Sequence, residues 1–68
     1  MYDNIHLIID YGTHIQEFYN VSLKDIKYGD DYKLIIYNDN GKIIREIPLT
    51  GSWEKKIEDN KLTFKKVG

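Results

Sequence analysis

The chain contains no cysteine and no alanine, and it has only one proline, one methionine and one arginine among its 68 residues. Without cysteine, it can form no disulfide and offers no thiolate to a zinc ion. A chain of this length buries only about 60% of the surface that its unfolded form exposes, and such a core rarely contributes more than about 3–5 kcal/mol. Stability must therefore come from close packing, or from further burial against a second copy or another partner.

Long apolar runs are also missing: none approaches the about 20 residues that a membrane-spanning helix needs. The first residues, Met1 to Asn4, include neither a basic segment nor a small-residue cleavage site. Together with the missing cysteine, these features predict a cytoplasmic protein without membrane association. A composition of 41% hydrophobic and 31% charged residues is typical of a globular chain, so we expect one domain over residues 1–68.

Isoleucine, lysine, tyrosine and asparagine are abundant, with eleven, nine, six and five residues respectively. Their codons are rich in A and T, which indicates an AT-rich genome, such as that of a low-GC Gram-positive bacterium or its phage. Charge is divided unevenly along the chain. Residues 1–31 carry six acidic and two basic side chains, whereas residues 32–68 carry five acidic and eight basic ones. This asymmetry favours contacts between the two halves, self-association or an oriented partner.

Helix signals are scarce, because no window combines helical spacing of apolar residues with caps at both ends. Strand-forming residues and turn residues are dense instead. The turn Asn38–Gly41 contains Asn-Gly, the strongest short hairpin signal. The expected strands are Asn4–Asp10, His14–Val21, Lys24–Tyr28, Tyr32–Tyr37, Lys42–Pro48, Trp53–Glu58 and Lys61–Val67. A helical turn at 22–25 is the alternative for the third segment. The sequence thus predicts an all-β fold, a small antiparallel meander of six or seven short strands curled into a barrel or sandwich.

Several of these strands are apolar on both faces. In the segment 32–37, Tyr32, Leu34 and Ile36 face one way, and Ile35 and Tyr37 face the other. A sheet with one solvated face should alternate more cleanly. Either the sheet is strongly curled and has a second small apolar cluster, or another chain covers its outer face.

Chemistry-bearing residues are few. His6, Asp10 and His14 are the only set that resembles metal ligands, but their spacing matches no known zinc signature. Ser22 and Ser52 lack the Gly-x-Ser-x-Gly context of a serine nucleophile, and the adjacent carboxylates at 30–31 and 58–59 fall in turns. No phosphate-binding loop is present. We therefore expect no metal, no cofactor and no enzymatic activity.

Two groups of side chains are candidate binding sites. A basic patch in the last hairpin comprises Lys55, Lys56, Lys61, Lys65 and Lys66, with Trp53 and Phe64 nearby; small β-barrels bind single-stranded nucleic acid with such residues. The single arginine and the net charge of −1 argue against this partner. Tyrosine suits protein interfaces because it has a large ring and a polar tip. The expected interaction surface comprises Tyr11, Tyr28, Tyr32, Tyr37, Ile35 and Ile44.

The segment from Ile5 to Thr13, the run Glu17–Val21, the turn Asp39–Gly41 and the run Ile47–Leu49 together resemble small β-meander proteins of low-GC Gram-positive bacteria and their phages. The resemblance covers about residues 5–49 and consists of turn residues, so it concerns topology. It implies a binding protein that blocks a host machine, such as a defence system. The leading expectation is a non-enzymatic protein-binding module, homodimeric, that binds a host or self protein. The alternatives are a protein that sequesters a small ligand or nucleotide, and a single-stranded nucleic-acid binder.

Overall fold

The computed structural model describes all 68 residues and contains six strands and no helix. The strands are β1 (Tyr2–Asp10), β2 (Ile15–Tyr28), β3 (Asp31–Tyr37), β4 (Ile43–Leu49), β5 (Trp53–Glu58) and β6 (Lys61–Lys66). The predicted all-β class is confirmed, and the bounds of β5 are those expected from the sequence. The structure contains no helix that could span a membrane.

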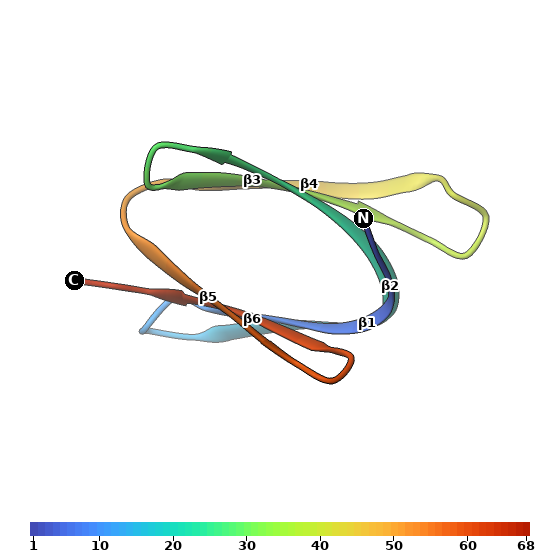
Figure 1. The fold of residues 1–68 in the computed structure, drawn as a ribbon, viewed down its shortest axis with the longest axis horizontal. Helices are drawn as coiled ribbons and strands as arrows, with labels where there is room; N and C mark the ends of the chain where they lie inside the picture. The colour runs from blue at the N-terminus through green and yellow to red at the C-terminus, as the bar shows by residue number, and fades with distance from the viewer.

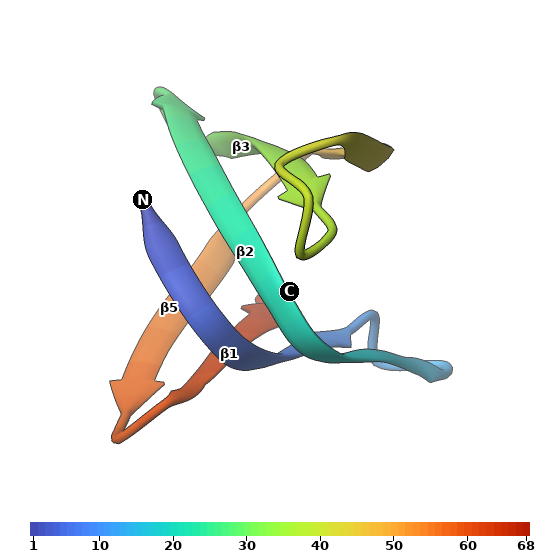
Figure 2. The same ribbon diagram turned by 90° about the vertical axis from the view of Figure 1, so that its right-hand side faces the viewer.

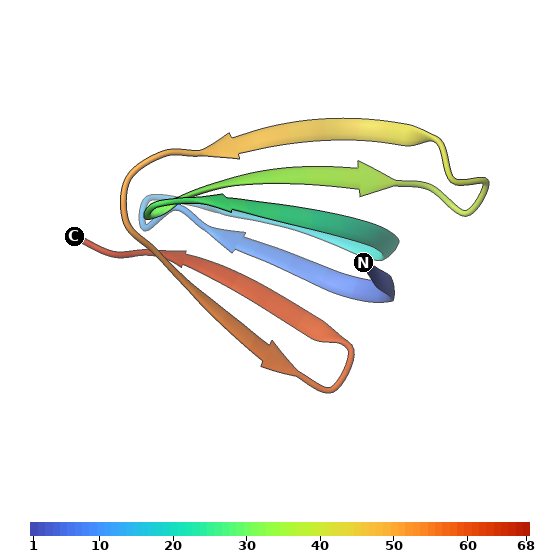
Figure 3. The ribbon, with the colours of Figure 1, turned by 45° about the horizontal axis from the view of Figure 1, so that its top comes forward.

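All six strands belong to one sheet, in the order β4-β3-β2-β1-β6-β5 (Figure 3). Strands β1 to β4 form the expected antiparallel meander. The prediction of a wholly antiparallel sheet is wrong, because β6 pairs with β1 in parallel. After β4, a loop at 50–52 carries the chain to the opposite edge of the sheet. There the hairpin β5–β6 places β6 alongside β1, running in the same direction.

Strand β2 is a single strand of 14 residues, where the sequence predicted two short strands or a helical turn. Its first part, up to Leu23, pairs with β1, and its last part, from Ser22 to Tyr28, pairs with β3. Val21 and Leu23 are buried where these two ladders meet. The strand continues because both halves find a neighbour, so each backbone group has a ladder to join.

Two compensating β-bulges bend β1 and β2 together. Between the pairs Tyr2–Leu23 and Ile5–Val21, β1 contains one extra residue; between Ile5–Val21 and Leu7–Phe18, β2 contains one extra residue. Each bulge holds an asparagine with positive φ, Asn4 at 51° and Asn20 at 55°. Bulges bend a strand and increase its twist. Figure 2 looks onto this bend, where β1 and β2 run side by side.

Replacing Asn20 with alanine should lower the free energy of unfolding by about 1–2 kcal/mol, because a Cβ-bearing residue without a polar side chain tolerates positive φ poorly. Asn20→Gly should not lower it, since glycine adopts this conformation freely. Urea unfolding of both variants checks this, with Asn40→Ala as the control at a turn asparagine whose φ is not positive. Equal stabilities for the alanine and glycine variants would contradict the strain argument.

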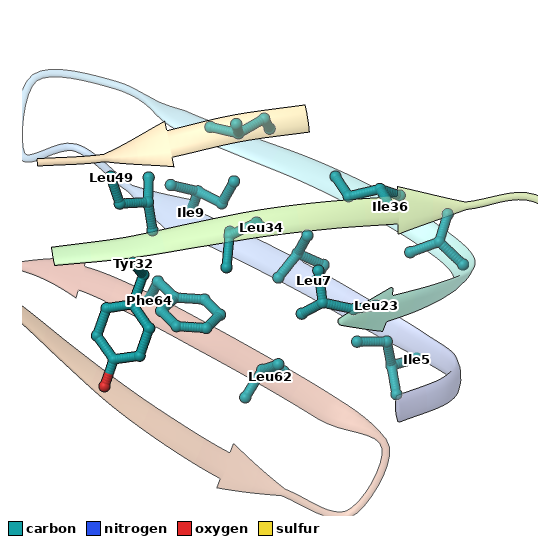
Figure 4. Packing of buried hydrophobic residues seen from close by; sticks show 12 residues of the cluster. Ile5, Leu7, Ile9, Leu23, Tyr32, Leu34, Ile36, Leu49, Leu62 and Phe64 are labelled. Atoms are coloured by element: carbon teal, nitrogen blue, oxygen red, sulfur yellow. The ribbon is translucent and has the colours of Figure 1, made fainter. Parts of the chain in front are cut away.

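The curled sheet encloses an apolar core between two layers. Strands β3 and β4 form one layer, and β1, β5 and β6 lie across from them. Strand β2 curves along one side of the molecule and connects the two layers (Figure 1). The core consists of 12 buried residues, all of them hydrophobic. Tyr32 and Phe64 meet edge to face across it, with ring centroids 5.1 Å apart (Figure 4). The edge strands β4 and β5 do not pair with each other, so the sheet is not closed into a barrel.

Candidate interaction surface

One outward-facing part of the sheet carries most of the predicted interaction residues. On β3, the side chains of Tyr32, Leu34 and Ile36 are buried in the core, so those of Ile35 and Tyr37 face outward by alternation. The outer side of the adjoining parts of β2 and β4 continues this surface. We call it the Ile35 face; its apolar members are Ile26, Tyr28, Ile35, Tyr37, Ile43 and Ile44.

Ile35 occupies the middle of this face. It lies directly opposite Lys24 of β2 and Glu46 of β4. Ile35 itself is only partly exposed, while a salt bridge of 3.2 Å joins Lys33 and Glu46 beside it. Both members of this salt bridge are about half exposed, so it contributes little to stability. The face therefore has an apolar middle with charged residues beside it.

A bulge in β4 adds two exposed isoleucines to one end of the Ile35 face. Ile36 pairs with Arg45, but Tyr37 pairs with Ile43, so Ile44 is the extra residue. Ile43 and Ile44 are 53% and 50% exposed. Two adjacent isoleucines in this state leave a large apolar area in water, beside the half-buried ring of Tyr37.

The structure places four of the six predicted interaction residues on or beside the Ile35 face: Tyr28, Ile35, Tyr37 and Ile44. The prediction that Tyr32 belongs to the interaction surface is wrong, because its side chain is only 8% exposed and packs in the core. Tyr11 lies elsewhere, in the β1–β2 turn. Its ring stacks on His14 at 4.5 Å and meets Trp53 edge-on at 5.7 Å, and its hydroxyl donates a hydrogen bond of 3.1 Å to Gln16.

The five lysines of the predicted basic patch do not share one surface. Lys55 lies on the inner side of β5, where its Nζ contacts a carboxylate oxygen of Asp25 at 2.5 Å. Lys66 lies over the Trp53 ring, 5.2 Å from its centroid, and donates a hydrogen bond of 3.3 Å to the Thr50 carbonyl. Both ammonium groups therefore have partners within the chain.

The other three lysines of this group lie on the outer side of the β5–β6 hairpin, among acidic residues. Cross-strand neighbours are Glu54 with Lys65, Lys56 with Thr63, and Glu58 with Lys61. Opposite charges directly across a ladder attract each other. This side of the hairpin is therefore mixed in charge rather than uniformly basic.

The Asp25–Lys55 pair joins two strands that are not neighbours in the sheet. Its side chains are only 16% and 24% exposed, and Lys55 Nζ lies 4.8 Å from the centroid of the Tyr2 ring. Partial burial lowers the pKa of Lys55, but its interactions with Asp25 and Tyr2 outweigh this and raise the pKa above its ordinary value. The ammonium group is therefore well compensated in the folded state.

The structure does not bring His6, Asp10 and His14 together as metal ligands, and no group of three suitable side chains is close enough to hold a metal ion. His6 contacts Glu17 at 3.0 Å, and Asp10 accepts a hydrogen bond of 2.8 Å from the Gly12 amide.

Beside His6, the ring of Tyr19 stacks at a centroid distance of 4.2 Å. The negative charge of Glu17, together with desolvation and a hydrogen bond, raises the pKa of the Tyr19 phenol above its ordinary value. This cluster lies on the outer side of β1 and β2. All of its members are at least partly exposed, so it has no enclosed space in which a substrate could be held away from water.

No pocket is found anywhere on the chain. Comparison with protein-family models, with curated proteins and with solved structures finds no match.

Two features of the surface were not among the predicted site residues. Ile26 and Ile43 belong to the Ile35 face. Alternation along β2 is the signal that could have found Ile26. Alternation along β4 would instead place Ile43 on the inner side with Ile47, and only the bulge at Ile44 turns it outward. The Asp25–Lys55 pair joins residues 30 apart. No local pattern could have found it, because only the curl of the sheet brings β5 near β2.

Proposed function

We propose that this protein is a non-enzymatic protein-binding module that contacts its partner through the Ile35 face. The observation that carries the proposal is that β3 and β4 bear apolar side chains on both sides. Their inner side fills the core, whereas Ile43 and Ile44 on the outer side of β4 remain at least half exposed, as does Tyr28 on the outer side of β2. Exposed apolar patches of this kind mark interaction sites in soluble proteins.

The chemistry of the face matches that of a protein interface. Interfaces have an apolar core and a polar rim, and they are enriched in tyrosine and depleted in lysine and glutamate relative to the rest of the surface. Here Ile35 is central, Tyr37 lies at one end with Ile43 and Ile44, and Lys24, Lys33 and Glu46 are the flanking charges. The partner that fits has an apolar patch with polar residues around it, and the tyrosine hydroxyl can hydrogen-bond at the boundary.

The resemblance to small proteins of low-GC Gram-positive bacteria and their phages supports a bacterial protein as the partner. In this proposal, the chain acts in the bacterial cytoplasm and inhibits its target by occupying a surface that the target needs, as a phage-encoded inhibitor of a defence system would. Such inhibition requires contact area and no chemistry. It is compatible with a chain whose buried residues are all hydrophobic.

The proposal is tested by affinity capture from a lysate of a low-GC Gram-positive bacterium. Wild-type protein should retain a specific bacterial protein. Ile35→Glu should lose at least about 90% of it, because a carboxylate at the centre of the interface would be desolvated without a partner.

The matched control is Thr63→Glu. Thr63 is also partly exposed and faces outward, but it lies on β6, away from the Ile35 face. This variant should retain the same protein as the wild type does. Equal retention by Ile35→Glu and Thr63→Glu, or retention of nucleic acid or a nucleotide in place of a protein, would contradict the proposal.

A further inference from the structure

Strand β5 is an open sheet edge with unpaired backbone groups. Glu58 and Lys61 flank a two-residue turn and therefore form a hydrogen-bonded pair. At the other end of the hairpin, the Val67 amide donates a hydrogen bond of 2.9 Å to the Ser52 carbonyl. The backbone amide and carbonyl groups of the even-numbered residues of β5 thus form hydrogen bonds with β6. By alternation, the amide and carbonyl groups of Trp53, Lys55 and Ile57 face away from the sheet.

Strand β5 is also the one strand without a buried residue. Ile57 lies on the inner side, directly opposite Leu62, yet it is 55% exposed. Trp53, on the same side, is only partly buried. Ile57 therefore offers apolar surface on the core side that an added neighbouring strand could cover.

The sequence of β5 is complementary to itself in the antiparallel direction. If Lys55 lies opposite Lys55 of a second copy, Glu54 lies opposite Lys56 of that copy, and the reverse pair forms by symmetry. Trp53 then lies opposite Ile57, again twice. Both Lys55 side chains are already bound to Asp25 of their own chains, which reduces their mutual repulsion.

This register also aligns the free backbone groups. Odd-numbered residues lie opposite odd-numbered residues, so the outward amides and carbonyls of Trp53, Lys55 and Ile57 all find partners. Centring the pairing on Lys56 instead would place Lys56 against Lys56, and Glu54 against Glu58 twice. Like charges directly across a ladder are destabilising, so the register centred on Lys55 is favoured over the one centred on Lys56.

The other edge, β4, is less suitable for such pairing. Pro48 has no amide hydrogen to donate, and the bulge at Ile44 interrupts the strand. An antiparallel pairing centred on Arg45 or on Glu46 opposes like charges. The free edge that a second copy fits is therefore β5.

We propose that two copies of this chain associate through β5, in antiparallel pairing centred on Lys55, and join their six-stranded sheets into one continuous sheet. The dimer buries Ile57 against Trp53 of the second copy and forms two Glu54–Lys56 pairs. This inference is independent of the proposed function, because the Ile35 face lies on β2, β3 and β4 and stays uncovered in the dimer.

Sedimentation equilibrium over a range of protein concentrations tests this inference. The wild type should show a reversible monomer–dimer equilibrium. Glu54→Lys should weaken the dimer about tenfold or more, because it turns both Glu54–Lys56 pairs into like-charge pairs. The double variant Glu54→Lys/Lys56→Glu should recover most of the lost affinity, because the pairs re-form with their charges exchanged.

Glu46→Lys on the other edge is the control and should leave self-association unchanged. The far-ultraviolet circular dichroism of every variant should match that of the wild type, so that the charge exchange reports on association alone. A monomer at millimolar concentration, or a Glu54→Lys variant that associates like the wild type, would overturn the inference. So would a double variant no tighter than Glu54→Lys.

Discussion

Phe64→Ala is expected to leave the chain largely unfolded at 25 °C. Phe64 is fully buried and packs edge to face on Tyr32, linking β6 to β3 across the core (Figure 4). Truncating a buried phenylalanine costs about 3–5 kcal/mol. That is comparable to the total of about 3–5 kcal/mol available to a domain of this size. Circular dichroism and the dispersion of amide NMR signals measure the outcome.

Tyr19→Ala is the matched control for this prediction. Tyr19 is also an aromatic strand residue, but it is 63% exposed and stacks only on His6. Its removal should cost less than about 1 kcal/mol, as for other exposed positions. A folded Phe64→Ala variant with near-wild-type stability would show that the two layers do not depend on the core contact across them.

Asp25→Ala is expected to lower the free energy of unfolding by about 1–3 kcal/mol, because it leaves a half-buried ammonium group without its partner. The effect should be much larger than that of Glu46→Ala. Glu46 pairs with Lys33 at 3.2 Å and in a far more exposed setting, where an ion pair contributes about 0–1 kcal/mol. Urea unfolding at neutral pH compares the two variants.

The pH dependence of this pair gives a second readout. The pKa of Lys55 is raised in the folded state above its ordinary value of 10.5. The stabilisation by Lys55 is therefore fully present below about pH 10.5 and is lost as pH rises through the folded pKa. The difference in the free energy of unfolding between wild type and Asp25→Ala should therefore narrow as Lys55 loses its proton. No difference between the two proteins at pH 7 would contradict the role of this pair.

The local parts of the fold could be predicted from the sequence. The hairpins around Asn38–Gly41 and around Asp59-Asn60 form where the turn residues indicated, because a short turn determines the pairing of the strands beside it. The inner residues of β3 also follow directly from alternation. These features depend on neighbours in the chain, and a single sequence contains that information.

The non-local parts could not be predicted in this way. Nothing near β6 specifies that it pairs with β1, some 55 residues earlier, rather than with an adjacent strand. The break expected between Val21 and Lys24 was also wrong, since the polar residues there lie on the outer side of a continuous strand. Neither the bulges at Asn4 and Asn20 nor the resulting bend has a distinct sequence signal, because asparagine is equally common in ordinary turns.

The sequence predicted that an apolar surface would be exposed, but it did not predict correctly which residues form that surface. The two-sided apolar pattern of β3 and β4 indicated an exposed apolar face, and Ile35 and Tyr37 lie there. Tyrosine content alone, however, does not separate Tyr32, which faces the core, from Tyr37, which faces out. Their sequence separation is odd, so alternation places them on opposite sides of β3.

The two proposed binding surfaces lie on different strands and suit different partners. The β5 edge presents backbone groups and charges suited to a second copy, whereas the Ile35 face presents isoleucine and tyrosine side chains suited to another protein. In the proposed dimer, two Ile35 faces would be available. Such a bivalent arrangement increases avidity for a partner that is itself oligomeric.

The central claim is that the Ile35 face is the binding surface, and methyl cross-saturation NMR on the complex with the captured protein tests it most directly. Isoleucine δ1-methyl groups lie both on the Ile35 face and on the outer side of β1 and of the first part of β2, so they report on both regions. We predict saturation transfer to Ile26, Ile35, Ile43 and Ile44. Transfer confined to Ile8 and Ile15, on the outer side of β1 and β2, would contradict the account.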